Sequence, residues 1–326
     1  MKRLTSILAI ALSALLVNAC MVGRVATKYA LTPKRHGVAD IPRTRHKADS
    51  LLPGSTAWYD SLKALGVMRD TFIVGYNNYR VHAVYAPAAK PGEANGTALI
   101  IHGYGDNHLV FLYLGRMYRD ELNYNILMPD LQYHGYSEGP SIQMGWLDRF
   151  DILNWINVAQ GIYHSDFMVL HGVSMGGATV MFTSGEPTPD YVRCFVEDCG
   201  YNSVRGQFKK NLKDIGPIPT DVLNSASIVT NRKFGWSFKE ADCSKQLAKC
   251  KKPMLFIHGD ADDFVAFEDL WKNYNAKTQG YKEYWVAEGA VHANSYARYP
   301  EEYTRRVSNF LQTVHKMIED GTYEQQ

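Results

Sequence analysis

The sequence predicts an α/β fold in which a mostly parallel sheet of eight strands is flanked by helices. Short apolar runs that suit buried strands alternate with segments long enough for helices. Two strand patterns at the start of this region are separated by a turn signal at residues 75–78, which indicates an antiparallel hairpin. Alternation of strands and helices places the helices on both faces of a parallel sheet.

The expected strands are short and evenly distributed. They cover residues 71–74, 79–85, 98–102, 124–128, 167–171, 194–197, 254–258 and 283–286. Helices are expected at residues 55–65, 108–121, 145–161, 175–184, 264–276 and 300–318. In the last of these, apolar residues recur at helical spacing, which predicts that one face packs on the sheet.

Residues 203–240 interrupt the alternation between the sixth and seventh strands, because they are rich in Lys, Asn, Ser and Pro. Ligands of α/β proteins bind beyond the carboxyl ends of the strands. An insertion at this point overhangs that edge of the sheet. We therefore expect residues 203–240 to form a small lid on a domain that spans residues 55–320.

The N-terminus has the pattern of an export signal. Lys2 and Arg3 precede an apolar run, residues 4–17, that is too short to span a bilayer. Cys20 follows a small residue, and this junction resembles the lipobox of bacterial lipoproteins, in which the cysteine is lipidated. Ordinary signal-peptidase cleavage is the competing interpretation. Both predict that residues 1–19 are removed and that the protein is exported, as a membrane-anchored lipoprotein of the cell envelope or in a secreted or periplasmic form.

Residues 20–54 have the composition of a basic tether. Within them, residues 21–50 hold seven Lys or Arg residues, few apolar residues, and Pro33 and Pro42. This favours a solvated linker between membrane and domain. The formal net charge of the whole chain is only +2, and it is carried by the two basic residues of the export signal. A balanced charge gives no support for nucleic-acid binding.

Four cysteines remain if Cys20 is lipidated, and the sequence leaves their state open. Cys194 or Cys199 bonded to Cys243 or Cys250 is one alternative in an oxidising compartment, and free buried thiols are the other. No Cys or His spacing typical of a metal site is present, so we expect no metal.

The sharpest chemical signal is the motif Gly172-Val-Ser174-Met-Gly176. It follows an expected strand and precedes an expected helix, which is the context of a nucleophile elbow. Glycines are needed there because side chains would clash in so tight a turn. The turn exposes the hydroxyl of Ser174 above the sheet, where it can act as a nucleophile.

A serine nucleophile needs a base and a carboxylate, which follow it in the chain in the order acid, then histidine. His292 lies in the loop after the last strand, where an imidazole can reach both partners. The loop after the seventh strand offers Asp260, Asp262 and Asp263, and composition alone does not choose among them. Asp198, at the end of the sixth strand, is a fourth candidate for the acid.

Negative charge on a reacting carbonyl oxygen requires two N–H donors. The amide of Met175, directly after the nucleophile, is the first candidate. The second is the amide of Tyr104, between two glycines in the loop after the third strand. The phenol of Tyr104 is an alternative donor. His134 is expected to fix a loop that lines the site.

Taken together, these motifs resemble bacterial α/β-hydrolases of the serine-esterase and S33-peptidase-like type, which are related to the hydrolase domain of bile-acid–CoA acyltransferases. The resemblance covers roughly residues 70–312 and favours Asp262 as the acid. The matching stretches are His102-Gly-Tyr-Gly-Asp-Asn, Pro129-Asp-Leu-Gln-Tyr-His-Gly-Tyr-Ser-Glu-Gly, Gly145-Trp-Leu-Asp-Arg-Phe-Asp, His171-Gly-Val-Ser-Met-Gly-Gly-Ala-Thr, Glu197-Asp-Cys-Gly-Tyr-Asn-Ser and His258-Gly-Asp-Ala-Asp-Asp-Phe-Val.

The resemblance implies a serine hydrolase that forms an acyl-enzyme and needs no cofactor. The expected substrate is a small molecule or peptide with an acyl group, and a carboxylic ester is the first choice. A peptidase, in particular a serine aminopeptidase, is the second, and an acyl thioesterase or acyltransferase the third. From another class of protein, a surface-binding lipoprotein with a vestigial site is the alternative.

Overall fold

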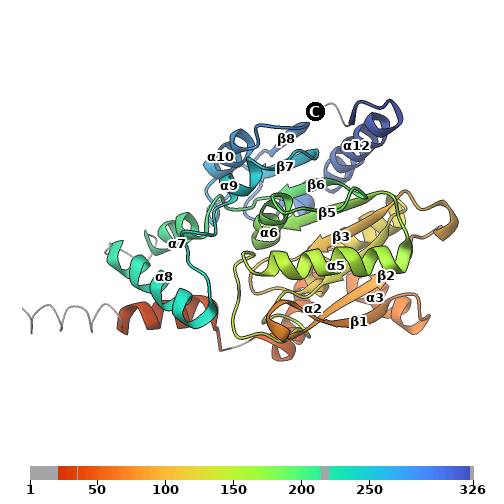
Figure 1. The fold of residues 1–326 in the computed structure, drawn as a ribbon. Coiled ribbons are helices and arrows are strands. Elements are labelled where there is room, and N and C mark those ends of the chain that lie inside the picture. The colour runs from red at the N-terminus through yellow and green to blue at the C-terminus, as the bar shows by residue number, and fades with distance from the viewer. Residues whose placement is uncertain (1–20, 35, 214–219, 324–326) are drawn as a thin grey trace, which may run out of the picture.

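Eight strands form one sheet in the computed structural model, which describes residues 21–34, 36–213 and 220–323 (Figure 1). The strand order is β1-β2-β4-β3-β5-β6-β7-β8, and β2 runs antiparallel to both of its neighbours while β3 to β8 are parallel. Both the eight-stranded, mostly parallel sheet and its N-terminal hairpin are thereby confirmed. The bounds are β1 Arg69–Val74, β2 Arg80–Ala86, β3 Thr97–Ile101, β4 Asn125–Pro129, β5 Met168–Val173, β6 Val192–Asp198, β7 Met254–Gly259 and β8 Lys282–Ala287.

Two layers of helices cover the two faces of the sheet, as Figure 1 shows. One layer consists of α5 (Asp148–Tyr163), α6 (Met175–Ser184), α9 (Cys243–Leu247) and α10 (Glu268–Ala276). The other consists of α2 (Ile41–Leu51), α3 (Ser55–Ala64), α4 (Leu112–Arg116), α11 (Ser295–Arg298) and α12 (Pro300–Glu319). Strands β3, β4, β5 and β7 are buried along their whole length, because helices exclude water from both of their faces.

Residues 21–31 differ from the expected solvated linker, because they are helical and pack on the domain. Gly23, Thr27 and Leu31 are buried at a spacing of four residues, which places them along one narrow face of the helix. A Cβ atom at Gly23 would lie 2.7 Å from the backbone of Ser225, so this glycine permits a close approach of two helices. Two of the basic residues that suggested a tether, Arg24 and Lys28, are exposed on this helix, and three others belong to the helix of residues 41–51.

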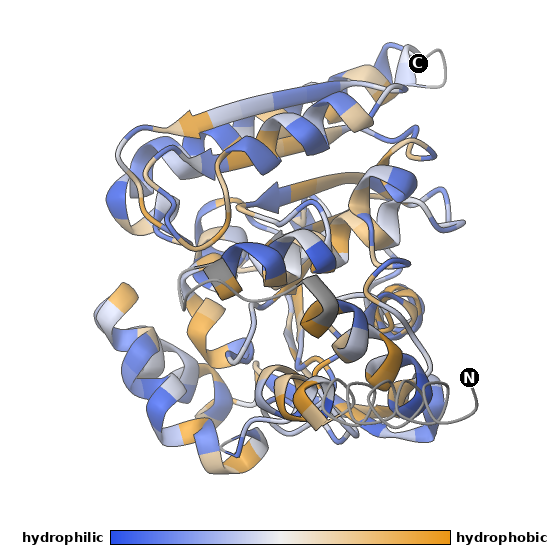
Figure 2. Ribbon diagram, turned by 90° about the vertical axis from the view of Figure 1, so that its left-hand side faces the viewer, coloured by the Kyte–Doolittle hydropathy of each residue, from blue (hydrophilic) through white to orange (hydrophobic). Residues whose placement is uncertain are grey.

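The insertion between β6 and β7 contains α7 (Val204–Lys213) and α8 (Thr220–Phe234). Figure 1 shows both helices beyond the carboxyl edge of the sheet, with α8 beside the N-terminal helix of residues 21–31. Seen from the side of these helices, Figure 2 shows hydrophobic and hydrophilic residues interspersed along them. This position agrees with a lid, but the role of a lid stays a prediction.

The expected signal peptide, residues 1–19, and the expected lipid acceptor Cys20 lie outside the described residues. Within the described part, no helix has the length and apolar character to cross a membrane. The four remaining cysteines are buried and free: Cys194, Cys199, Cys243 and Cys250.

Candidate active site

Ser174 occupies the turn between β5 and α6, in a backbone conformation that few residues other than glycine adopt. Its φ is 59° and its ψ is −119°, and holding a residue in such a region costs about 1–3 kcal/mol. Neighbouring glycines make the turn sterically feasible. A Cβ atom at Gly172 would lie 2.1 Å from the carbonyl oxygen of Gly176, and one at Gly176 would lie 2.1 Å from that of Ile101.

The three residues expected to share a proton path meet at this turn. The Oγ atom of Ser174 lies 2.8 Å from Nε2 of His292. On the other side of the ring, Nδ1 of His292 lies 2.8 Å from Oδ2 of Asp262. Because the carboxylate accepts a hydrogen bond from the N–H group at Nδ1, Nε2 carries no proton and can accept that of the serine hydroxyl.

The carboxyl of Asp262 is held in its charged form. Burial by itself would raise its pKa, but the imidazoles of His258 and His292, which lie 3.2 and 2.8 Å from Oδ2, outweigh burial and keep the pKa of Asp262 below its usual value. The second oxygen accepts the backbone N–H groups of Phe264 and Val265 at 2.9 and 2.8 Å. These bonds fix the orientation of the carboxylate toward the imidazole.

The other three candidate carboxyls have different partners. Asp260 accepts the N–H of Gly289. Asp263 is exposed, and its backbone oxygen accepts a hydrogen bond from Lys210.

Asp198 accepts hydrogen bonds from Ser295 and Tyr303 at 3.3 and 3.1 Å, and burial raises the pKa of Asp198 to about 6. The carboxyl that hydrogen-bonds the imidazole is therefore that of Asp262.

The backbone around the nucleophile offers the two expected N–H donors. Met175 is the first residue of α6, and the first N–H groups of a helix have no intrahelical acceptor. The loop of Tyr104 passes close to the serine. A Cβ atom added at Gly103 would lie only 3.5 Å from Cβ of Ser174. The phenol of Tyr104 instead donates to the carbonyl oxygen of Ala30 at 2.8 Å. This leaves the amide of Tyr104 as the candidate donor.

Two histidines hold the Tyr104 loop by accepting backbone N–H groups. Nε2 of His102 accepts from Leu131 at 2.9 Å, and Nε2 of His134 accepts from Gly105 at 3.1 Å. The second of these bonds agrees with the expected role of His134. Both rings are fully buried, and burial lowers the pKa of His134 to about 3, so the ring stays neutral and keeps a lone pair for this bond.

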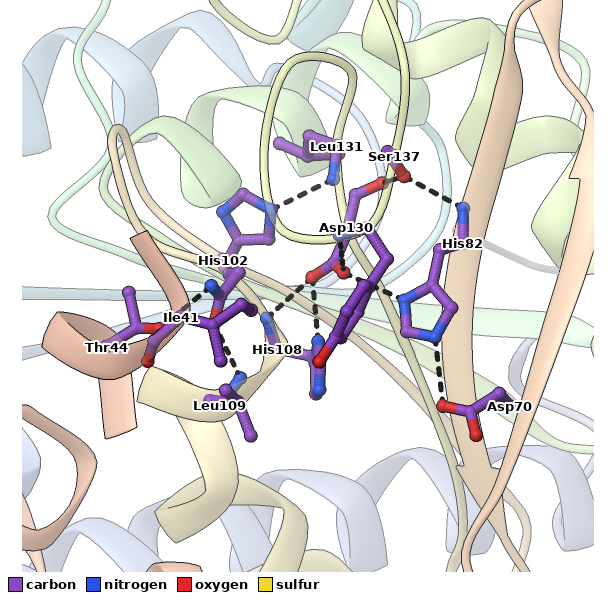
Figure 3. A network of polar contacts seen from close by, with 12 residues as sticks. Ile41, Thr44, Asp70, His82, His102, His108, Leu109, Asp130, Leu131 and Ser137 are labelled. Carbon is purple, nitrogen blue, oxygen red and sulfur yellow. Dashed lines mark hydrogen bonds and ion pairs between the residues drawn. The ribbon is translucent and has the colours of Figure 1, made fainter. Parts of the chain in front are cut away.

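Beneath this loop, Asp130 is the centre of a buried network that no sequence pattern predicted (Figure 3). Its two oxygens each lie 2.8 Å from an Nδ1 atom, one of His82 and one of His108. They also accept the backbone N–H groups of His108 and Tyr136, both at 2.9 Å. Asp130 follows β4 directly and lies in one of the stretches that carry the family resemblance, but neither signal predicted its partners.

This network ties strand β2 to the loops that follow β3 and β4. Ligand atoms of His82, His108 and Asp130 lie within 4.8 Å of one another, which is close enough for a metal site. However, both oxygens of Asp130 already accept hydrogen bonds from backbone and imidazole groups. The contacts therefore favour a structural network that positions the loop of Tyr104.

A cavity of about 910 Å³ opens at Ser174, within the size range of ligand sites. Its walls come from the nucleophile turn, from α7 and α8, and from the N-terminal helix. The ring of Phe264 lies in this wall with its centroid 4.9 Å from that of His292. The nucleophile thus faces a ligand-sized space at the carboxyl edge of the sheet.

Strand order, the turn at Ser174 and the position of the cavity define an α/β-hydrolase. The chain belongs to the prolyl oligopeptidase family, whose family model matches residues 143–317. The match contains Ser174, Asp262 and His292. The protein is thus a serine hydrolase of the α/β-hydrolase fold, as the motifs predicted, while the relation to bile-acid–CoA acyltransferases stays a prediction.

Relatives with similar sequences span most of this chain. YqkD of Bacillus subtilis is 26% identical over 231 residues, which cover 70% of this chain and 75% of the relative. YfhR of Escherichia coli K12 is 23% identical over 238 residues, which cover 71% of this chain and 76% of the relative.

Solved structures show the same fold at lower identity. The Pyrococcus furiosus esterase Pf2001 superposes with a TM-score of 0.60 at 22% identity, covering 77% of this chain and 95% of the esterase. A membrane phospholipase A, described as a bacterial virulence factor, superposes with a TM-score of 0.58 at 17% identity, covering 97% of this chain and 99% of the phospholipase. The acylaminoacyl peptidase of Pyrococcus horikoshii superposes with a TM-score of 0.56 at 14% identity, covering 78% of this chain and 43% of the peptidase.

The His82–Asp130 pair predicts a pH dependence of stability. Burial alone would lower the pKa of His82, but the hydrogen bonds and charges of Asp130 and Asp70 raise it above its usual value. A group whose pKa is raised on folding stabilises the folded protein. This contribution is complete below the pKa of the histidine in the unfolded chain, about 6.5, and is lost as the pH rises through its pKa in the folded protein.

We therefore expect H82Q to lower the free energy of unfolding by about 2–4 kcal/mol at about pH 6 and by less at about pH 9. Urea denaturation of both proteins at the two pH values measures this difference. If H82Q loses the same free energy of unfolding at both pH values, or loses more at the higher pH, the ring of His82 is not charged in the folded protein.

Proposed function

We propose that the protein hydrolyses carboxylic esters through an acyl-enzyme on Ser174. The observation that carries this proposal is the hydrogen-bonded chain from Ser174 through His292 to Asp262 at the wall of the cavity. This geometry supports the catalytic roles that we propose for the three residues. The fold itself accommodates both esterases and peptidases, so it does not decide the substrate.

In the first step, Oγ of Ser174 attacks the ester carbonyl carbon while Nε2 of His292 takes the hydroxyl proton. Asp262 stabilises the imidazolium that forms. The amides of Met175 and Tyr104 donate to the negative oxygen of the tetrahedral intermediate. The intermediate collapses when the carbon–oxygen bond to the alcohol breaks, and His292 returns the proton to the departing alkoxide oxygen.

In the second step, water replaces the alcohol. His292 takes a proton from water as its oxygen attacks the acyl carbon, and a second tetrahedral intermediate forms at the same amides. The bond between Oγ of Ser174 and the acyl carbon then breaks, and the serine regains its proton from His292. The products are a carboxylic acid and an alcohol, and the enzyme returns to its starting state.

The lining of the cavity supports an ester over the substrate of an aminopeptidase. An enzyme that binds the free amino terminus of a peptide needs a carboxylate for the buried ammonium group. Among the described residues that line the cavity there is no Asp or Glu. A neutral acyl ester, in contrast, needs no such partner.

Substitution of the nucleophile tests the mechanism. We expect S174A to lower kcat/KM for p-nitrophenyl butyrate by at least about a thousandfold, because no acyl-enzyme can form. The far-ultraviolet circular dichroism should stay unchanged. S165A is the matched control, since Ser165 lies just before the amino end of β5, the opposite end from Ser174, and it should keep wild-type activity. Retained turnover in S174A would rule out the mechanism.

Substitution of the carboxyls tests which one is the acid. We expect D262N to lower kcat by about 10⁴-fold, because an amide neither stabilises the imidazolium nor selects the same tautomer. D198N should cost far less, since Asp198 hydrogen-bonds Ser295 and Tyr303 instead of His292. Steady-state kinetics on the same ester measures both effects. The opposite ranking would assign the acid to Asp198.

We also propose that Cys20 carries lipid and, with the basic residues that follow, anchors the protein to a membrane. A lipid chain binds membranes stably when a second signal, such as clustered Lys and Arg, adds to it. We expect C20S to abolish incorporation of labelled palmitate during expression and to move the protein from the membrane fraction to the soluble fraction. Equal labelling of C20S would place any lipid elsewhere.

A further inference from the structure

The cavity at Ser174 is built in part by a segment outside the α/β core. The N-terminal helix of residues 21–31 supplies one wall, and α7 and α8 supply the facing wall. The apolar side chains in these walls are Val25, Ala26, Tyr29, Ala30, Phe208, Leu212, Val222, Leu223 and Ala226. The space between the walls begins at the nucleophile and is bounded mainly by aliphatic and aromatic groups.

Specific contacts hold the N-terminal helix in this position. Oγ1 of Thr27 donates to the carbonyl oxygen of Ala226 in α8 at 3.2 Å. At the other end of the helix, the phenol of Tyr104 donates to the carbonyl oxygen of Ala30, and the backbone N–H of Ile142 donates to that of Leu31 at 2.8 Å. The wall is therefore fixed both to the insertion and to the loop of Tyr104.

Charge in the lining is confined to exposed positions. Among the described lining residues, the charged ones are Lys28 and Lys34, and both are exposed. A peptide in the apolar part of the cavity would leave backbone N–H and C=O groups without partners, which costs about 1–3 kcal/mol for each group. A hydrocarbon chain has no such groups and gains from leaving water.

We propose that this cavity binds the acyl chain of a long-chain fatty acid ester, with its carbonyl at Ser174 and its chain between the N-terminal helix and α8. The N-terminal helix is then a part of the substrate site. This inference rests on the proposed ester hydrolysis and adds the class of substrate. The chain length at which binding saturates is set by the distance between the nucleophile and the far end of these walls.

Chain-length dependence in the wild-type protein provides the first test. Each methylene group buried in an apolar site raises kcat/KM by up to about fourfold. We therefore expect kcat/KM to rise steadily from p-nitrophenyl acetate to the decanoate, measured below the concentration at which the esters form micelles.

Two other outcomes of this test are distinguishable. Activity that peaks at the acetate or butyrate and falls for longer chains would overturn the acyl site but leave ester hydrolysis intact. Absence of activity on every ester, with peptide nitroanilides cleaved, would overturn the proposed function itself and the acyl site with it.

Two bulky substitutions test the walls one at a time. A226W fills the cavity from α8, and A26W fills it from the N-terminal helix. We expect each to lower the ratio of kcat/KM for the decanoate to that for the butyrate by at least about tenfold.

I228W and V22W are the matched controls, because Ile228 and Val22 are exposed positions on the same two helices and do not line this cavity. Both controls should keep the wild-type ratio. Thermal unfolding identifies any variant that fails to fold, and the wild-type chain-length series stands without the variants. If folded A26W keeps the wild-type ratio of kcat/KM for the decanoate to that for the butyrate, the N-terminal helix is not a wall of the acyl site. A wild-type ratio in both folded tryptophan variants would overturn the acyl site.

Discussion

The arrangement of the site depends on a backbone turn that forces Ser174 into a positive φ. This turn persists because the surrounding structure leaves no alternative: Gly172 and Gly176 are in contact, and the amide of Ser174 donates to the carbonyl oxygen of Asp198 at 2.7 Å. Contacts with β5, α6 and β6 together thus hold Ser174 in this strained conformation. Because the nucleophile is fixed, the imidazole and the carboxylate need only be placed by the loops after β8 and β7.

Sequence reasoning located the parts of the site that depend on local pattern. The strands are buried apolar runs, and the motif at Ser174 needs glycines at fixed positions, so both could be predicted from residue types alone. The choice of Asp262 could not, because three aspartates lie within four residues of one another. Their difference arises in the folded loop, where one oxygen of Asp262 accepts two backbone N–H groups and the other contacts the imidazole.

The N-terminal helix and the network around Asp130 were not foreseen, and both depend on contacts between distant segments. Small residues such as Gly23 and Thr27 gave no apolar signal, yet they allow a helix to approach α8 closely. Asp130 binds residues of β2 and of two loops, and no spacing in the sequence reveals that convergence. In this protein the buried strands can be predicted from the periodicity of apolar residues, whereas the cavity at Ser174 depends on how the N-terminal helix packs against the insertion.

The central claim is that Ser174 is an activated nucleophile, and covalent labelling of the native protein tests it most directly. An alkyl fluorophosphonate reacts with a serine whose proton is removed by a neighbouring base. Mass spectrometry of the treated protein should show one adduct, located on the peptide that contains Ser174, with labelling strongly reduced in H292A. A native protein that stays unlabelled, or an adduct on another residue, would contradict the account.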